Sequence, residues 1–172
     1  SRLDSELSRI KLTTVDASRM LGALADIRNT AAAAAPGRPT VKLALPGRDK
    51  LQAKADEDRL VQVFQNVLGN AESFSPPGGV ITVGGGAEGS YMRIAIDDQG
   101  PGIPPGKEKD IFNRFYTERP AAEKFGTHSG LGLSISKQIV EAMGGTIHAE
   151  NLKHPDGRVA GARFVIRLQR AG

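Results

Sequence analysis

Cysteine is absent from the 172 residues of this chain, and histidine occurs only three times. Without cysteine the chain can form neither a disulfide framework nor a zinc ribbon, and it has no thiolate nucleophile. Three scattered histidines cannot complete a tetrahedral metal site alone. These absences exclude disulfide-stapled domains and cysteine-based enzymes, and they are compatible with a reducing compartment.

Long hydrophobic runs are also absent. No stretch approaches the roughly 18 consecutive apolar residues that span a bilayer, and the first residues lack the charged-then-apolar pattern of a secretion signal. Apolar residues make up 39% and charged residues 24% of the sequence, which is the balance of a globular domain. We therefore expect one soluble domain of ordinary size with its own core.

Aromatic residues are few, with six Phe, two Tyr and no Trp, and basic residues form no run of five. The net charge is +4, from 23 basic and 19 acidic residues that are interleaved along the chain. A nucleic-acid groove needs a clustered basic surface. The sequence therefore predicts no nucleic-acid partner, although a ligand with a few phosphates would match the small positive excess.

Apolar periodicity divides the chain into helices and strands. Residues 1–10 are predicted to form the last turns of a helix, and further helices are predicted over 17–30 with Asp16 as N-cap, over 56–74 and over 131–143. Strands are predicted over 41–45 and 51–55 on either side of a turn at Pro46-Gly47, over 80–84 and 91–97 as an antiparallel hairpin, and over 146–150 and 161–168. The long stretch 98–129 has little periodicity, which indicates a functional lid. Segregated helices and strands favour an α+β fold, a two-layer α/β sandwich with helices on one face of a mixed, largely antiparallel sheet.

Helix 56–74 is predicted to carry a polar stripe beside its apolar face. At 100° per residue the stripe contains Arg59, Gln62, Asn66, Asn70 and Ser73. Asn66 and Asn70 are one turn apart, and their carboxamides offer oxygen to a hard cation such as Mg²⁺ and nitrogen to phosphate. Alone, such a pair is more often simply solvated.

A carboxylate followed by glycines closes the second strand of the predicted hairpin, in segment 97–104. An ionised Asp98 accepts hydrogen bonds only, so in a cleft it can select an exocyclic amine such as that of adenine. Gly100 and Gly102 would let the backbone approach a flat ligand. The alternative is an ordinary acidic residue between a strand and a turn.

Two further glycine-rich segments have different interpretations. Segment 126–133 leads into a helix, where backbone N–H groups can donate to a triphosphate, or the glycines simply begin the helix without a ligand. Gly84, Gly86 and Gly89 have the spacing of a dinucleotide-binding loop, but a strand follows them instead of a helix. We therefore predict that they form the tip of a hairpin.

Four segments together resemble the N, G1, F and G2 boxes of sensor histidine kinases. They are 66–76 (NVLGNAESFSP), 98–103 (DQGPGI), 111–116 (IFNRFY) and 129–133 (SGLGL). The resemblance covers roughly residues 40–168 and implies the catalytic and ATP-binding domain of that family, with the Bergerat-type sandwich shared with gyrase and mismatch-repair ATPases. The stretch SGLGLSISKQIVEA is similar to alphaproteobacterial envelope-stress sensors of the ChvG/ExoS type.

The resemblance implies ATP and Mg²⁺ as cofactors. Asp98 would recognise the adenine amine, and Asn66 and Asn70 would hold Mg²⁺ and phosphate. The implied ATP-binding residues are Asn66, Asn70, Asp98, Gly100, Gly102, Ile103, Tyr116, Ser129, Gly130, Leu131 and Gly132. Residues 117–129 would form the ATP lid.

Two positions depart from the family pattern. Ser73 stands where a phosphate-binding Lys is frequent, and Thr117 stands where an Arg is frequent. The residues that could supply the missing positive charge are Arg119, Lys124 and Lys137.

None of the three histidines lies in a His-Glu-x-x-x-Pro setting, so we expect the phosphoacceptor upstream of this chain. The resemblance implies that residues 1–10 end a dimerisation and phosphotransfer helix and that 11–172 form the catalytic and ATP-binding domain. That domain would act as a protein-histidine kinase. Its partners would be its own phosphotransfer domain and a response regulator. The whole protein would be a homodimer anchored in the inner membrane, with this chain in its cytoplasmic portion and monomeric when isolated.

Two other functions remain open. Ser73 and Thr117 are compatible with a degenerate docking module that binds ATP weakly or not at all. An ATPase or serine kinase of the same superfamily is the third possibility, but a hydrolase would want Glu in place of Asn66 as general base, and an amide cannot accept that proton.

Overall fold

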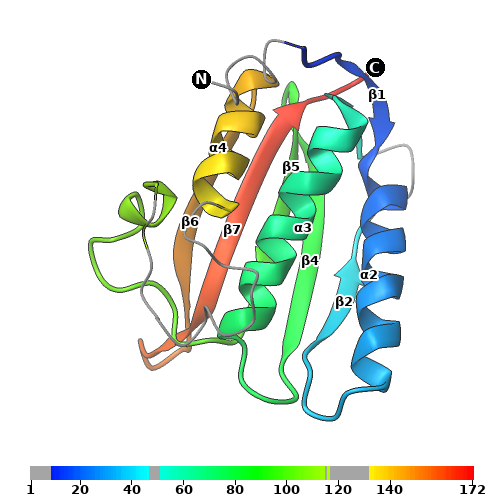
Figure 1. Cartoon of the computed structure of the whole chain (residues 1–172). Helices are drawn as coiled ribbons and strands as arrows, with labels where there is room; N and C mark the ends of the chain where they lie inside the picture. Colours follow the sequence, from blue (N-terminus) through cyan, green and yellow to red (C-terminus); the bar gives the residue numbers. More distant parts are fainter. Residues whose placement is uncertain (1–8, 47–50, 115, 117–131) are drawn as a thin grey trace.

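The computed structural model describes residues 9–46, 51–114, 116 and 132–172. Within them, three α-helices cover one face of a five-stranded sheet (Figure 1). The helices are α2 (Ala17–Ala33), α3 (Glu57–Phe74) and α4 (Gly132–Ala142), and η2 (Asp110–Phe112) is one turn of 3-10 helix. The strands are β1 (Thr13–Asp16), β2 (Thr40–Ala44), β3 (Gln52–Ala55), β4 (Val80–Glu88), β5 (Tyr91–Asp97), β6 (Thr146–Lys153) and β7 (Val159–Gln169). The predicted α+β two-layer sandwich is confirmed.

The large sheet has the strand order β2-β4-β5-β7-β6. Among the described strands, β2 and β4 form its one parallel pair and the other neighbours are antiparallel, so the sheet is mixed and largely antiparallel as predicted. The β4–β5 hairpin turns at Gly89, whose φ of 62° lies in the left-handed region that glycine tolerates. Of the three glycines with dinucleotide-loop spacing, only Gly89 is at the predicted tip. Gly84 and Gly86 pair within β4, because this strand continues to Glu88 and not only to residue 84 as predicted.

Both long N-terminal helices begin at an aspartate cap. The backbone N–H of Arg19 donates to Asp16 Oδ1 at 3.0 Å at the start of α2, and that of Arg59 donates to Asp56 Oδ1 at 3.2 Å at the start of α3. The apolar face predicted for α3 is buried at every position, namely Leu60, Val63, Phe64, Val67, Leu68 and Ala71. No helix in the described part of the chain is long and apolar enough to cross a membrane.

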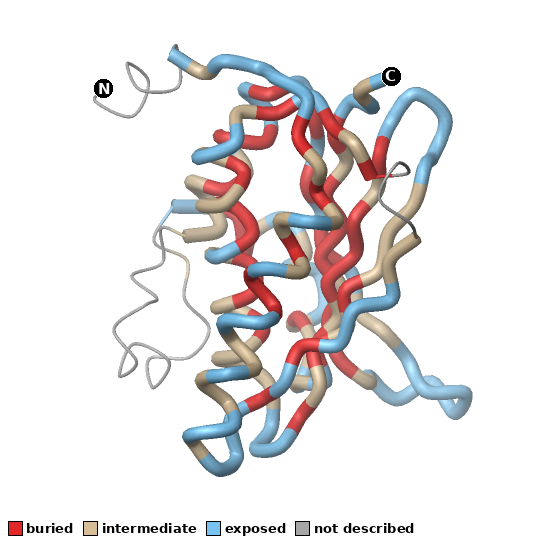
Figure 2. The backbone as a smooth tube through the Cα atoms, turned by 90° about the vertical axis from the view of Figure 1, so that its right-hand side faces the viewer, coloured by how far each residue is buried: buried red, intermediate tan, exposed pale blue. Residues whose placement is uncertain are grey.

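The core lies between the helix layer and the sheet, where Figure 2 shows the buried residues concentrated. Alternation along β5 sends Ile94 and Ile96 into this core, and they pair across strands with Ile166 and Phe164 of β7. The α3 face packs over them. This packing fixes where β5 ends relative to α3.

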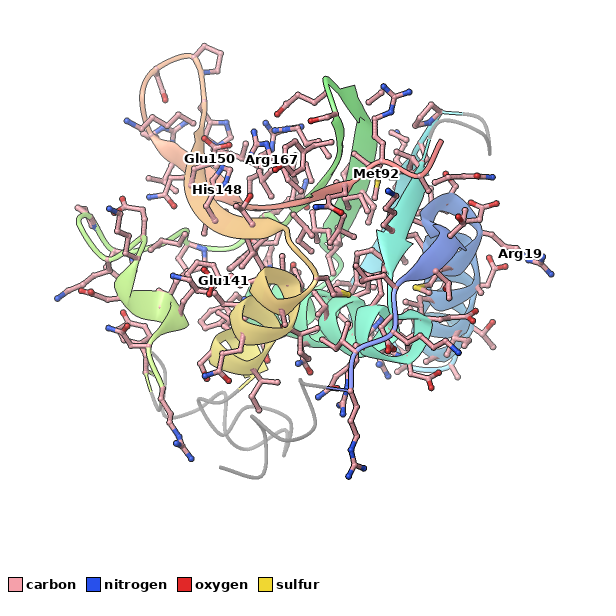
Figure 3. All side chains as sticks on the ribbon, turned by 90° about the horizontal axis from the view of Figure 1, so that it is seen from above. Arg19, Met92, Glu141, His148, Glu150 and Arg167 are labelled. Atoms are coloured by element: carbon pink, nitrogen blue, oxygen red, sulfur yellow. The ribbon has the colours of Figure 1, made fainter. Side chains whose placement is uncertain are left out.

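The opposite face of the sheet carries charged side chains. Figure 3 shows Arg167, His148 and Glu150 on the side of the sheet away from the helices. Arg167 donates from Nε to Glu88 Oε1 at 2.7 Å, and this hydrogen bond lowers the pKa of Glu88. Arg163 pairs with Asp97 through two bonds of 2.7 and 2.8 Å. Ion pairs thus cover a face on which the described residues place no second layer.

Strands form over both predicted segments 41–45 and 51–55, but they do not pair with each other. β2 lies parallel to β4, whereas β3 pairs antiparallel with β1. The sequence did not predict β1, because its four residues are too few to show an alternating pattern. Local hydrophobic alternation predicts a strand and not its partner. Most of the turn between them and most of the helix end predicted in 1–10 lie outside the described residues.

The edge strand β2 is closed by an asparagine of α2. The backbone N–H of Val41 donates to Asn29 Oδ1 at 2.7 Å, and Asn29 Nδ2 donates to the Val41 carbonyl at 2.9 Å. The backbone N–H and carbonyl of Val41 are both thereby satisfied, which reduces the tendency of an open edge to pair with another chain.

We predict that two isoleucine-to-alanine changes on helices differ sharply in stability. Ile139→Ala on α4 removes a side chain that is 0% exposed, whereas Ile27→Ala on α2 removes one that is 64% exposed. The first change is expected to lower the free energy of unfolding by about 2–5 kcal/mol because it leaves a cavity, and the second by less than about 0.5 kcal/mol. Urea denaturation followed by circular dichroism measures both, and equal losses would contradict this placement of the core.

Candidate functional site

A cavity of about 1010 Å³ opens between α3, the start of α4 and the loop that follows β5. The predicted site residues that line it are Asn66, Asn70, Asp98, Gly102, Ile103, Tyr116 and Gly132. Gly100 adjoins them through a hydrogen bond to Asp98. Ser129, Gly130 and Leu131, together with most of the predicted lid, lie outside the described residues. The predicted site residues that the structure describes therefore lie together around one cavity.

Asp98 is the buried charge of this cavity. It follows the last residue of β5, and only 3% of it is exposed. Its Oδ1 accepts the backbone N–H of Gly100 at 2.8 Å and that of Ala162 on β7 at 3.2 Å. Burial raises the pKa of Asp98, and the two N–H donors offset part of that rise because they favour the ionised form.

The second carboxylate oxygen of Asp98 has a different environment. Among the described residues, no hydrogen bond is made to Oδ2. Since Asp98 lines the cavity, Oδ2 is suited to accept a hydrogen bond from a ligand.

Packing inside the protein explains both glycines of the G1 segment. A Cβ on Gly100 would overlap the carbonyl oxygen of Phe74 at the end of α3. Gly102 has a φ of 81°, and a Cβ there would overlap Val159 and lie 2.7 Å from Asn151 Oδ1. The sequence led us to expect glycines that make room for a ligand. In the structure they let the loop lie against α3 and the β6–β7 hairpin.

Asn66 joins α3 to the first turn of α4. Its Nδ2 donates to the carbonyl of Gly132 at 3.3 Å and to Ser136 Oγ at 3.2 Å, and Ser136 is fully buried. With the nitrogen donated to α4, the carboxamide oxygen of Asn66 receives no hydrogen bond from the described residues and can serve a ligand. Asn70, one turn further along α3, lines the same cavity and is half-buried.

The described walls of the cavity contain no cluster of acidic metal ligands. No group of three or more His, Asp or Glu side chains able to hold a metal occurs in the described ranges. The two asparagines offer neutral oxygens, which suit Mg²⁺ only when a ligand supplies the remaining, charged oxygens. These residues therefore fit an ion that arrives with a phosphate compound.

Of the three basic residues expected to replace the phosphate-binding lysine that is frequent at position 73, the structure describes only Lys137. Lys137 Nζ lies 5.9 Å from the centroid of the Phe112 ring, so this ammonium rests on an aromatic face. Phe112 in turn meets Phe164 edge to face at 6.1 Å. Arg119, Lys124 and Thr117 lie outside the described residues, whereas Ser73 lines the cavity.

Sequence reasoning missed an arginine cluster at another part of the cavity wall. Arg28 of α2 forms an ion pair with Glu72 of α3, and Arg38 Nε lies 3.6 Å from the same carboxylate. Burial lowers the pKa of Arg28, and the charge of Glu72 opposes that effect. Arg28 and Glu72 are 44 residues apart, and no local pattern indicates their contact.

Comparison with known families supports one identity. The family model described as "Histidine kinase-, DNA gyrase B-, and HSP90-like ATPase" matches residues 55–172. The sensor protein ChvG of Rhizobium meliloti is 41% identical over 98% of this chain, and that of Agrobacterium fabrum is 38% identical over 99%. The sensor histidine kinase WalK of Bacillus subtilis is 38% identical over 63% of the chain. The chain spans only 30%, 29% and 18% of the length of these three relatives, respectively.

Solved structures show the same fold. The mycobacterial sensor histidine kinase MprB superposes with a TM-score of 0.72 at 28% identity, over 94% of this chain and all of the other. The catalytic domain of the histidine kinase ThkA superposes with a TM-score of 0.77 at 22% identity, over 93% of this chain and 96% of the other. The chain belongs to the family of histidine kinase-, DNA gyrase B- and HSP90-like ATPases, and within it to the ATPase domains of sensor histidine kinases.

Proposed function

We propose that this chain binds Mg²⁺ and ATP and transfers the γ-phosphate to a histidine of another segment of the same protein, for relay to a response regulator. The observation that carries this proposal is the meeting of Asp98, Asn66 and Asn70 in one cavity. Residues 11–172 would be the catalytic and ATP-binding domain, and residues 1–10 the end of the dimerisation and phosphotransfer helix. The whole protein would be a membrane-anchored homodimer with this domain in the cytoplasm.

Asp98 would recognise the adenine base. Oδ1 is fixed by the N–H groups of Gly100 and Ala162, so the direction of Oδ2 is fixed as well. An ionised carboxylate accepts hydrogen bonds and cannot donate, which suits the exocyclic amine of adenine. Ile103 and Phe164 line the same cavity and would contact the apolar faces of the base.

Asn66 and Asn70 would hold the ion and the phosphates. Both are on the stripe of α3 that faces the cavity, and their amide oxygens suit Mg²⁺ when phosphate oxygens complete its coordination. When bound, the ion would neutralise charge on the phosphates. Gly132, at the start of α4, and the adjoining residues Ser129, Gly130 and Leu131 would surround the phosphates.

The proposed chemistry favours transfer over hydrolysis. In the reaction a bond forms between an imidazole nitrogen and the γ-phosphorus, the bond from that phosphorus to its bridging oxygen breaks, and ADP leaves. Asn66 cannot accept a proton from water, because its carboxamide is not a base. The chain would contribute position and charge compensation, the usual means of catalysing phosphoryl transfer.

Phosphate transfer itself is the test of this function. We expect the chain, mixed with radiolabelled ATP, Mg²⁺ and a separately supplied phosphotransfer domain, to label a histidine of that domain. The phosphorylated product should be stable to base and labile to acid. ADP binding without any labelling would favour the docking-module alternative, and rapid ATP turnover without acceptor would favour an ATPase.

Changing Asp98 to Asn is expected to weaken ADP binding by about 100-fold or more, because an amide N–H2 would then face the adenine amine. The Asn oxygen can still accept the bonds from Gly100 and Ala162, so we expect the free variant to remain folded. Isothermal titration calorimetry measures the affinity, and thermal unfolding checks the fold. Tight ADP binding by the variant would show that Asp98 does not recognise the adenine base.

The same carboxylate predicts the pH dependence of base recognition. Burial raises the pKa of Asp98 above its ordinary value, and only the ionised form accepts the amine. Adenosine affinity is therefore expected to be constant above this raised pKa and to fall about tenfold per pH unit below it. Adenosine is the probe because it lacks titrating phosphates. A profile that stays flat down to the ordinary pKa of Asp would contradict the assignment.

Asn70→Ala is expected to reduce the gain in ADP affinity that Mg²⁺ provides, while the affinity without Mg²⁺ changes less. The reason is that the amide oxygen would serve the ion and not the base. Gln62→Ala is the matched control, since Gln62 is on the same stripe of α3 but does not line the cavity. Titrations with and without Mg²⁺ give the ratio, and an equal loss in both conditions would exclude the proposed metal role.

A further inference from the structure

Asn151 of β6 bonds both backbone polar groups of one residue of the G1 segment. The backbone N–H of Ile103 donates to Asn151 Oδ1 at 2.6 Å, and Asn151 Nδ2 donates to the Ile103 carbonyl at 2.8 Å. One carboxamide thus pairs with the N–H and the carbonyl of one residue, as a residue of a neighbouring strand would. The two residues are 48 positions apart, so this contact joins distant parts of the chain.

The residue paired with Asn151 across β6 and β7 holds the other end of the loop. In the β6–β7 ladder Asn151 lies directly opposite Ala162. The backbone N–H of Ala162 donates to Asp98 Oδ1, and its carbonyl accepts the backbone N–H of Asp98 at 2.9 Å. The loop from Asp98 to Ile103 is therefore fastened at one end through Ala162 and at the other through Asn151.

The space around Gly102 shows how closely the loop is seated. A Cβ on Gly102 would meet both Asn151 and Val159, the first residue of β7. Ile103 is 7% exposed and lines the cavity together with Ala162, whereas Asn151 does not line it. Any effect of Asn151 on a ligand must therefore pass through Ile103 and its neighbours.

We infer that Asn151 is a positioning residue of the nucleotide site. It fixes the distance between the Ile103 wall and the Asp98 carboxylate, so that the base enters a gap already shaped for it. This inference rests on the proposed function, in which Asp98 and Ile103 contact adenine. Its physical basis is preorganisation, since a loop ordered before binding loses less conformational freedom when the ligand arrives.

The chain offers a matched control in Asn29. Asn29 makes the same two-bond contact with the backbone N–H and carbonyl of Val41, at 2.7 and 2.9 Å, but neither residue lines the cavity. Both asparagines satisfy one N–H and one carbonyl, so their removal is expected to cost similar stability. A purely structural role for Asn151 predicts the same binding behaviour in the two variants.

The experiment compares Asn151→Ala and Asn29→Ala with the unaltered chain. We expect both to lower the unfolding temperature similarly, while only Asn151→Ala weakens ADP and adenosine binding, each by about tenfold. Inorganic tripolyphosphate, which lacks the base, is expected to lose little affinity. Hydrogen exchange of the Ile103 amide should become faster in Asn151→Ala alone. Should that variant fail to fold, Asn151→Ser is expected to weaken ADP binding by a smaller factor, because its hydroxyl keeps a donor and an acceptor but on a single atom of a shorter side chain.

Unchanged ADP affinity in Asn151→Ala or Asn151→Ser, or an equal loss in Asn29→Ala, would overturn the positioning role. Normal ADP binding by the unaltered chain, abolished by Asp98→Asn, would then show that the nucleotide site itself stands. If the unaltered chain does not bind ADP, the proposed function and this inference both fail.

Discussion

The structure around the site depends on keeping the carboxylate of Asp98 charged although the residue is almost fully buried. Burial alone would drive Asp98 toward its neutral form, and the N–H groups of Gly100 and Ala162 oppose this by bonding to Oδ1. Those donors come from the next turn of the loop and from β7. The requirement therefore reaches beyond the loop: β5 must end beside β7, and position 100 must lack a Cβ so that the loop can close against α3.

Helix α3 transmits this constraint to the rest of the fold because its faces have separate contacts. The apolar face packs on the sheet, Asn66 bonds to the first turn of α4, and Glu72 pairs with Arg28 of α2. A rotation of α3 would break all three sets of contacts together. The stripe with Asn66 and Asn70 is thus oriented by the core and by both neighbouring helices, and not by the site itself.

The sequence predicted what local periodicity and short motifs can encode. The buried face of α3, the Asp16 cap of α2, the β4–β5 hairpin and the cavity position of Asp98 all follow from patterns within a few residues. The pairing of β3 with β1 did not, because alternation names no partner. The contact of Asn151 with Ile103 was also invisible, since an asparagine near a strand end is usually solvated and its partner lies 48 residues away.

Charge balance limits where phosphate neutralisation can come from. The described lining of the cavity contains two arginines, Arg28 and Arg38, and two carboxylates, Glu72 and Asp98. Both arginines are directed to Glu72, so this part of the wall offers little net positive charge to a ligand. Ser73 adds none where the family often has Lys. A triphosphate in this cavity therefore depends on charge that arrives with it, as a divalent ion, or on basic groups beyond the described walls, and the neutral oxygens of Asn66 and Asn70 suit the first of these.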